Sequence, residues 1–457
     1  MASAARPRPR TAERADRRLS GPARAAVVGA SFGFFVDMFD VYLPVVALTP
    51  AMDYFLPASV SPDSRAILNS LIFVATLIGR PLGSLIFGRL ADQIGRRRTT
   101  LYAVTGCGVC TGLIAVLPGY AQVGLLGVAL LVLLRLADGI FLGGEYAGAT
   151  PLAMESVPTG RRGWYGGLVG MGFPLSYCAI ALVTLLTLRI APAGSATSPY
   201  AVWGWRVPFV IGALLCLVFV VYYARSVTES EVWAKSTKSR NPVRDVLFGS
   251  ARREFVQVFV LMSGIWFASN LASGLLPSAL QTQGHVSATA VTGALVIVQA
   301  VHSVLFPYLG ALSERIGRRR FLAWCGVGIG VPTAAAFGTI SAGWWTGFGS
   351  VLALTAVIRI AGASAFAVTP SYLCERFPAA LRGSGFGLGY STPLILTSFY
   401  AYYQTWLGAI LPRGYTASAL LVLGGALVLV GALLGPESRN VEFGADPAPA
   451  ERPVAPS

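Results

Sequence analysis

The chain has 457 residues, of which 54% are apolar and only 12% are charged, and its mean hydropathy is +0.65. Soluble domains carry about 25% charged residues, so the polar groups of this chain cannot cover its apolar surface in water. The composition excludes a soluble enzyme, a disordered chain and a disulfide scaffold, and it predicts a membrane protein. The net charge of +15 does not indicate nucleic-acid binding, because it is not carried by a soluble domain.

Twelve apolar runs are long enough to cross a bilayer as helices, since each crossing needs about 20 residues. The polar, Arg-rich N-terminus leads into a full-length apolar run, which is not the pattern of a cleavable signal peptide. In chain order the twelve runs cover residues 25–48, 66–88, 99–119, 123–150, 163–188, 205–224, 255–279, 289–312, 321–341, 346–372, 384–408 and 416–435.

The basic residues fall almost entirely on one side of this predicted topology. If both ends of the chain are cytosolic, 28 of the 35 Lys and Arg residues lie in cytosolic segments, four lie on the opposite side and three lie inside spans. Cytosolic loops carry the excess of Lys and Arg in membrane proteins. The distribution therefore predicts cytosolic termini. Because nearly all of these residues are Arg, we expect a GC-rich bacterial source and an inner-membrane location.

Two sequence patterns occur once in each half of the chain. The pattern G-x-x-x-[D/E]-x-x-G-R-R-R covers residues 88–98 and 310–320, and E-x-x-P-x-x-x-R-G covers 155–163 and 375–383. Each copy follows the second or the fourth span of its half. The repeat predicts an all-α membrane protein with twelve transmembrane helices in two parallel six-helix bundles, a known transporter plan. The expected segments are an Arg-rich tail (1–24), two bundles (25–224 and 255–435), a central loop (225–254) and a disordered tail (436–457).

The repeated loop pattern resembles the signature of the major facilitator superfamily. Further short motifs resemble its metabolite:proton symporter branch, which lies near the sugar porters. These motifs are Arg80-Pro81-Leu82-Gly83, Arg135 with Gly139 and Gly143-Gly144-Glu145, residues 203–209, Glu229-Ser230 and Pro436-Glu437-Ser438-Arg439. The first span departs from that branch, because Asp37-Met38-Phe39-Asp40 stands where the branch has Glu first. The resemblance implies a proton-coupled secondary transporter that works by alternating access.

Ionisable residues inside the N-terminal spans are candidates for proton coupling. A charged group at this depth costs at least about 2.5–3.5 kcal/mol, so it is functional or paired. Asp37 and Asp40 are three residues apart on helix 1, while Arg135 and Glu145 lie on helix 4. Two carboxylates in a low-dielectric cavity repel each other, and a nearby Arg favours the ionised form. We expect one of Asp37, Asp40 and Glu145 to take the proton under the influence of Arg135. A static Arg–carboxylate pair, including one with Asp138, is the alternative.

A second set of span residues is a candidate for substrate binding. Arg80 is placed to contact an anionic substrate or to pair with Asp40. The C-terminal spans carry few charges, and their polar side chains suit the orientation of a small solute. Arg359, which occupies the place of Arg135 in the second half, is as well explained by packing. The expected substrate-binding residues are Arg80, Asn270, Gln299, His302 and Tyr390.

The repeated loop patterns are expected to form a gate. By resemblance, their acids and arginines make charge pairs between the two halves, which close the cytosolic mouth and break when it opens. The alternative is that the arginines only set the topology. The expected gating residues are Asp92, Arg96, Glu155, Arg162, Glu314, Arg318, Glu375 and Arg382.

The function expected from these patterns is proton-coupled import of a small polar metabolite, an organic acid or a zwitterion, with drug or metabolite efflux as the alternative. A membrane enzyme is disfavoured because His285 and His302 are the only histidines and no catalytic set of residues accompanies them. Direct use of ATP is disfavoured because the sequence contains no G-x-x-x-x-G-K-[ST] loop. A transport-dead receptor would need a large soluble domain. We expect a monomer whose partners are its substrate, protons and the bilayer, with no metal or cofactor; the six cysteines, Cys107 and Cys110 included, suit packing.

Overall fold

The computed structural model describes residues 19–56, 60, 62–342, 344–345 and 347–443, and it places helices and turns but no strand in this part of the chain. The tail residues 1–18 and 444–457, on which most of the predicted Arg-rich tail and C-terminal tail fall, lie outside the described residues.

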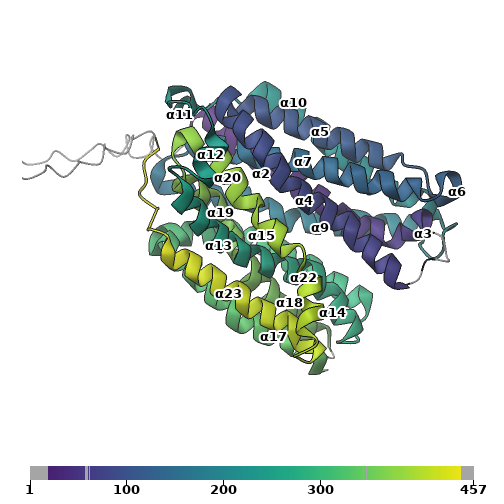
Figure 1. Ribbon diagram of the computed structural model, residues 1–457. Coiled ribbons are helices and arrows are strands. Elements are labelled where there is room, and N and C mark those ends of the chain that lie inside the picture. Colours follow the sequence, from purple (N-terminus) through teal and green to yellow (C-terminus); the bar gives the residue numbers. More distant parts are fainter. Residues whose placement is uncertain (1–18, 57–59, 61, 343, 346, 444–457) are drawn as a thin grey trace, which may run out of the picture.

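The first half of the chain forms one bundle of helices, shown in purple to teal in Figure 1. The short helices α3 (Met52–Phe55) and α6 (Tyr120–Val123) lie at the ends of its spans. Its long helices are α2 (Gly21–Leu43), α4 (Pro62–Ile94), α5 (Arg96–Ala115), α7 (Leu126–Glu155), α8 (Arg162–Gly170), α9 (Gly172–Ile190) and α10 (Arg206–Ser226). We refer to these elements as the N-bundle.

The second half forms a similar bundle, the C-bundle, shown in green to yellow. Two short helices, α11 (Glu231–Lys235) and α12 (Pro242–Leu247), link the bundles where only a loop was expected. The C-bundle consists of α13 (Arg252–Asn270), α14 (Leu276–Thr282), α15 (Ala288–Ile316), α16 (Arg318–Gly328), α17 (Ala334–Gly338), α18 (Phe348–Ala356), α19 (Thr369–Arg376), α20 (Arg382–Ser391), α21 (Pro393–Thr397), α22 (Tyr400–Leu407) and α23 (Thr416–Leu434).

Nine helical segments of the described chain are long and apolar enough to cross a membrane. The other three predicted spans are helical as well, but each departs from a plain apolar rod. Helix α5 begins with three arginines and carries several Thr and Gly residues. The tenth span breaks between α18 and α19, and the eleventh breaks at Pro393 and again before Tyr400. Broken helices at membrane depth are tolerated where protein surrounds them, so all twelve predicted spans correspond to helical segments.

The repeated loop pattern makes the same tight turn in both bundles. Gly95 separates α4 from α5 with φ of 112°, and Gly317 separates α15 from α16 with φ of 102°. Residues with a Cβ rarely adopt this conformation. A side chain would also collide with a carboxylate, because an added Cβ would lie 2.3 Å from Glu229 at Gly95 and 2.4 Å from Glu437 at Gly317. The glycine of each copy is therefore required by the turn.

The two bundles touch along α4 with α20 and along α8 with α15. We call the end of the molecule that carries the repeated loops the motif end; α11 and α12 lie there, at the upper left of Figure 1. The opposite end, which carries α3, α6, α14 and α22, is the far end. Close backbone contact holds the bundles together near the motif end, since a Cβ added to Gly163 would lie 2.3 Å from the Gly310 carbonyl oxygen.

Candidate functional site

An ion pair between α2 and α4 lies inside the N-bundle. A guanidinium nitrogen of Arg80 donates to Oδ1 of Asp37, and both side chains are almost completely buried. The same guanidinium lies 5.6 Å from the centre of the Tyr146 ring. Oδ2 of Asp37 and two nitrogens of Arg80 have no hydrogen-bond partner among the described residues. The pair is therefore held by a single contact and keeps free atoms for another ligand. Arg80 pairs with Asp37 and not with Asp40, which corrects the expected partner.

Glu145 of α7 lies beside this pair and has no partner of its own. It is 2% exposed, and neither carboxylate oxygen has a hydrogen-bond partner in the part of the chain that the structure describes. Glu145 and Asp37 line the same internal cavity of about 10 Å³, which is close to the space that one water molecule needs. A buried carboxylate without a cation or donor is very costly as an anion. A proton is the natural counter-charge at this position.

Arg135, in contrast, has its hydrogen bonds satisfied. Its Nη1 lies 2.9 Å from Oδ2 of Asp40 and 3.2 Å from Oδ2 of Asp138. Its Nε donates to Thr76, and its Nη2 donates to the Asp40 carbonyl at 3.0 Å. Thr111 donates to the other oxygen of Asp40 at 2.6 Å. The network joins α2, α4, α5 and α7 around one cation. It contacts neither Glu145 nor Asp37, so Arg135 is not placed to influence them directly.

The same network contains a group of metal-ligand types. The ligand atoms of Asp40, Cys107 and Asp138 all lie within 4.8 Å of one another. Arg135 binds both carboxylates, so a cation already fills the position that a metal ion would take. The residues present do not fit a metal site.

A buried arginine of the C-bundle has only neutral partners. Arg359 lies in a π-helical turn, Val357–Ala361, and is 1% exposed. It donates through Nη1 to the hydroxyl of Ser273, and through Nε to the side-chain oxygen of Gln299 at 3.1 Å. His302 lies one turn along from Gln299 on α15, with Nε2 3.4 Å from the Ser364 hydroxyl. Gln299 and His302, two of the expected substrate-binding residues, thus lie beside an arginine that the sequence explains as well by packing as by function.

Aromatic rings from both bundles meet at the centre of the molecule. Tyr146 stacks on Tyr390 with centroids 4.3 Å apart, and their hydroxyl oxygens are 3.2 Å apart. Phe173 stacks on Phe366 at 5.0 Å. Trp266 packs edge-on against Tyr390 and donates to its carbonyl at 2.8 Å. These stacks fill the interface between the bundles, and we call them the central aromatic layer.

A cavity opens between the bundles on the far-end side of this layer. It has a volume of about 370 Å³. One lining residue, Gly274, is the chain neighbour of Ser273, which binds Arg359. The lining residues are Pro44, Val45, Leu48, Thr49, Met52, Ile72 and Phe73 from the N-bundle, and Gly274, Ser278 and Tyr400 from the C-bundle.

At the motif end, each loop acid reaches the opposite bundle. Asp92 of the N-bundle accepts hydrogen bonds from the backbone N–H groups of Gly383 and Ser384 at 2.9 and 2.8 Å. Glu314 of the C-bundle accepts one from the N–H of Gly163 at 2.5 Å. Both acids therefore sit at the start of a helix, where unpaired N–H groups and the helix dipole favour negative charge.

The second repeated pattern is paired differently in the two halves. Glu155 bridges the bundles, with Oε1 2.6 Å from Arg382 and 3.5 Å from Arg96. Glu375 stays within its own bundle and accepts two hydrogen bonds from Arg318, at 3.2 and 3.3 Å. Among the described residues, the acids and arginines of this pattern form one charge pair between the bundles, Glu155–Arg382, whereas the equivalent pair of Glu375 with Arg162 is not formed.

The chain after α23 fills the place of the other pair. Arg162 donates to the Val441 carbonyl at 2.5 Å, and the Phe443 ring lies between the guanidinium groups of Arg162 and Arg382, 3.4 and 3.8 Å from its centre. The tail was expected to be disordered from residue 436. Up to Phe443, however, it packs across both bundles, because two buried arginines offer a cation–π site.

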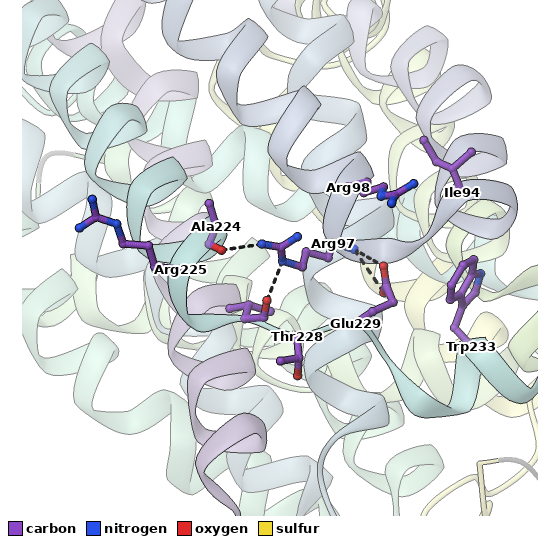
Figure 2. A pocket seen from close by; sticks show the side chains of 9 residues that line it. Ile94, Arg97, Arg98, Ala224, Arg225, Thr228, Glu229 and Trp233 are labelled. Atoms are coloured by element: carbon purple, nitrogen blue, oxygen red, sulfur yellow. Dashed lines mark hydrogen bonds between the residues drawn. The ribbon is translucent and has the colours of Figure 1, made fainter.

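Two further acids at the motif end escaped the sequence reasoning. Figure 2 shows Glu229 accepting from the backbone of Arg97, whose side chain donates to the carbonyls of Ala224 and Val227. This contact lies in a surface pocket of about 570 Å³. Glu437 accepts from the backbone of Arg318 in the same way at 2.9 Å. In the sequence, these two acids are marked by the Glu-Ser dipeptide that follows the sixth and the twelfth span.

The structure thus brings the candidate residues together in four groups. The first contains Asp37, Arg80, Glu145 and Tyr390, and the second contains Gln299 and His302 around Arg359. The third contains Asp40 and Arg135, and the fourth is the motif-end network. Asn270 joins neither of the first two, because its amide is bound to Thr397 of α21 at 3.1 Å.

Residues 30–298, more than half of the chain, match the sequence model of the Major Facilitator Superfamily. Two relatives from Escherichia coli K12 resemble most of the chain. The inner membrane metabolite transport protein YhjE is 27% identical over 91% of this chain and 94% of its own. The alpha-ketoglutarate permease is 28% identical over 80% of this chain and 83% of its own.

The fold resembles that of the proton:xylose symporter XylE, with a TM-score of 0.72 and 18% identity over 91% of this chain and 95% of that chain. The predicted twelve-helix fold and the prediction of a transporter in place of an enzyme are confirmed by these matches. The chain belongs to the Major Facilitator Superfamily, whose members carry small molecules across membranes.

Proposed function

We propose that the protein is a proton-coupled symporter that imports a small polar metabolite, an organic acid or a zwitterion, by alternating access. The names of its relatives support a metabolite substrate, since one carries alpha-ketoglutarate. The distribution of arginines supports a cytosolic motif end with both termini on that side. In this orientation the arrangement described here is closed to the cytosol, and its cavity lies on the outer side. The two bundles, 25–224 and 255–435, are the units that rock.

The observation that carries this proposal is the Asp37–Arg80 pair with the unpartnered Glu145 beside it. A proton delivered to this group neutralises one carboxylate. Once Asp37 is protonated, Arg80 loses its only counter-ion among the described residues and becomes available to an anion. Conversely, deprotonation restores the pair. Binding of a proton and of an anionic group are thereby linked, which is what symport requires.

The groups that face this site set its response to pH. Arg80 of α4 and Tyr146 of α7 lie on one side, and Tyr390 of α20 lies on the other. The Arg135 network is a separate cluster in which each nitrogen of Arg135 and both oxygens of Asp40 are bonded, while the oxygens of Asp138 have no hydrogen-bond partner among the described residues and only the ion-pair contact with Arg135. We assign this cluster to packing of the N-bundle. Asp37 and Glu145 therefore carry the proton, and Asp40 does not.

Proton-driven uptake into proteoliposomes tests the proposal. The purified chain is reconstituted, an acid-outside gradient is imposed, and accumulation of labelled alpha-ketoglutarate, L-proline and D-xylose is measured with and without a protonophore. We expect at least one of the two carboxylate compounds to accumulate only with the gradient. Glu145→Gln and Asp37→Asn should lose accumulation, whereas Glu231→Gln, a change at an exposed acid, should keep it.

Three results would reject parts of the proposal. Accumulation of none of the compounds under either gradient rejects carboxylate transport. Full gradient-driven uptake by both Asp37→Asn and Glu145→Gln rejects the proton site. Accumulation only with an acid-inside gradient identifies an antiporter and favours efflux over import.

A further inference from the structure

Arg359 differs from the other completely buried arginines of the described chain. Five arginines are less than 2% exposed, namely Arg80, Arg96, Arg135, Arg318 and Arg359. The first four each have at least one carboxylate within 4 Å, whereas Arg359 has none among the residues that the structure describes. A buried guanidinium without a counter-ion is unfavourable. Its retention here points to a ligand that supplies the negative charge.

The immediate surroundings of Arg359 leave hydrogen-bonding atoms unused. Nη2 of Arg359, Nε2 of Gln299 and Nδ1 of His302 have no partner in the described part of the chain, and all three side chains are at most 1% exposed. The other two nitrogens of the guanidinium are bonded, since Nη1 donates to the hydroxyl of Ser273 and Nε donates to the amide oxygen of Gln299. The arginine is thus fixed in orientation while one of its N–H edges remains free.

The free cation faces the opposite bundle. The guanidinium carbon lies 5.7 Å from the ring centres of Phe173 and Tyr177, both on α9 of the N-bundle. Tyr42 of α2 packs edge-on against the same two rings, at 6.1 and 5.2 Å. Any anion bound to Arg359 would therefore contact both bundles. Phe173 also stacks on Phe366, and Gly274, the residue after Ser273, lines the far-end cavity.

We propose that Arg359, positioned by Gln299 and Ser273, binds the carboxylate group of the transported solute. This inference rests on the proposed transport of an organic acid or a zwitterion and identifies the residue and the group that meet. A planar guanidinium binds carboxylates through two parallel hydrogen bonds. Arg359 has no carboxylate partner among the described residues in this arrangement, whereas Arg80 becomes available to a second anionic group only once Asp37 is protonated. The aromatic faces of Tyr42, Phe173 and Tyr177 suit an apolar ring or an organic cation on the rest of the solute.

The proposal also assigns roles to the neighbouring side chains. Gln299 and Ser273 are positioning residues, because they bind the guanidinium and not the solute. The carboxylate ties the C-bundle arginine to N-bundle rings, so an occupied site favours closure of the two bundles around it.

Thermal unfolding of the full-length protein in detergent tests the inference without any gradient. Acetate, benzoate and L-proline are compared with chloride at equal ionic strength, and D-xylose serves as a solute without a carboxylate. We expect at least one carboxylate to raise Tm by on the order of 2 °C or more through preferential binding to the folded state. Arg359→Met should abolish that rise, while Arg253→Met, a change at an exposed arginine, should keep it.

Direct binding by calorimetry gives the size of the effect. With the best carboxylate of the panel, Arg359→Met should weaken binding about 100-fold, the usual consequence of removing a charged hydrogen-bonding partner. Arg359→Lys should restore part of the affinity, because it keeps the charge without the planar fork. If Arg359→Met does not fold, Ser273→Ala is the milder variant, and it should weaken binding about 10-fold while the protein still unfolds in one cooperative transition at a slightly lower Tm.

The outcomes separate this inference from the proposed function. Carboxylate binding that is unchanged in Arg359→Met or in Ser273→Ala overturns the inference, as does a wild-type protein that no carboxylate stabilises over chloride. Arg359-dependent binding without proton-driven uptake keeps the inference and rejects symport. A preference for L-proline over benzoate identifies a zwitterion, and the reverse preference identifies an organic anion; both support the assigned carboxylate contact.

Discussion

Arg135 and Arg359 occupy similar places in the two bundles but have opposite surroundings. Arg135 is held by two carboxylates and a threonine, whereas Arg359 has only a serine, a glutamine and aromatic faces. The repeat has therefore kept the cation and changed its partners. In the N-bundle the arginine joins four helices, and the proposed proton site lies elsewhere. In the C-bundle the arginine is left with an unused edge that faces the other bundle.

The motif end shows the same kind of divergence. Glu155 reaches across to Arg382, while Glu375 turns back to Arg318 and to the hydroxyl of Ser438. Arg162 lacks a carboxylate within 4 Å among the described residues and instead binds the segment after α23. The two copies of the motif are thus bound differently, one through an ion pair between the bundles and the other through the segment 435–443, which we call the aromatic strap.

Charge reversal at Asp92 is expected to have the largest effect. Asp92→Lys places an ammonium group against two N–H groups at the start of α20 and beside Arg96, so the closed motif end cannot form. We expect uptake to fall below detection while the protein still inserts and purifies as a single species. Unchanged transport by Asp92→Lys would show that these contacts are not a gate.

Removal of Arg135 and removal of Arg359 should have different effects on the free energy of unfolding. Arg135→Met leaves two buried carboxylates without a cation and should cost about 3–5 kcal/mol, the usual price of breaking a buried pair. Arg359→Met removes a charge that has no counter-ion and should leave Tm unchanged or higher in carboxylate-free buffer. Both are measured by thermal unfolding in the same detergent. Equal losses of stability would mean that the two arginines serve the same role.

The two glutamates of the second repeated pattern should differ in how they affect the gate. Glu155→Gln weakens an ion pair between the bundles and should shift the equilibrium toward an open motif end by about 2 kcal/mol. Glu375→Gln changes a pair within one bundle and should shift it much less. Spin labels on Gly160→Cys and Ala380→Cys report the opening as a longer distance. Identical distance distributions for the two variants would contradict the asymmetry.

Loss of the strap should have the smallest effect. Phe443→Ala removes the ring between Arg162 and Arg382 and should favour the open state by about 1 kcal/mol, the scale of a cation–π contact. Phe443→Tyr keeps the aromatic face and should behave as wild type. The same pair of spin labels measures this change, and an effect as large as that of Glu155→Gln would show that the strap is the main lock.

The sequence predicts the spans and the turns of the repeated loops well, because these depend on composition and on local pattern, while the gate stays a prediction. Hydropathy identifies twelve runs, and the repeated acids and glycines mark the turns. The sequence does not, however, predict which acid pairs with which arginine. Asp37 and Asp40 lie near one face of the same helix, so spacing alone does not say which of them meets Arg80 and which meets Arg135. That choice depends on how α2, α4 and α7 are rotated against each other.

The role of Arg359 was missed for a related reason. Its sequence position suggests a copy of Arg135, and only the packed structure shows that no acid faces it in the described chain. The packing of the tail up to Phe443 could not be predicted either, because nothing in a polar, proline-containing segment indicates that it contacts Arg162 and Arg382.

Carboxylate binding as a function of pH, compared in the wild type, the double variant Asp37→Asn/Glu145→Gln and Arg359→Met, tests the division of labour between the bundles most directly. If solute and proton bind together, the affinity of the wild type rises as the pH falls. We predict that the double variant, which lacks both proposed proton acceptors, binds with an affinity that no longer depends on pH, and that Arg359→Met binds weakly at every pH. A pH-dependent affinity in the double variant, together with tight binding by Arg359→Met, would contradict the account.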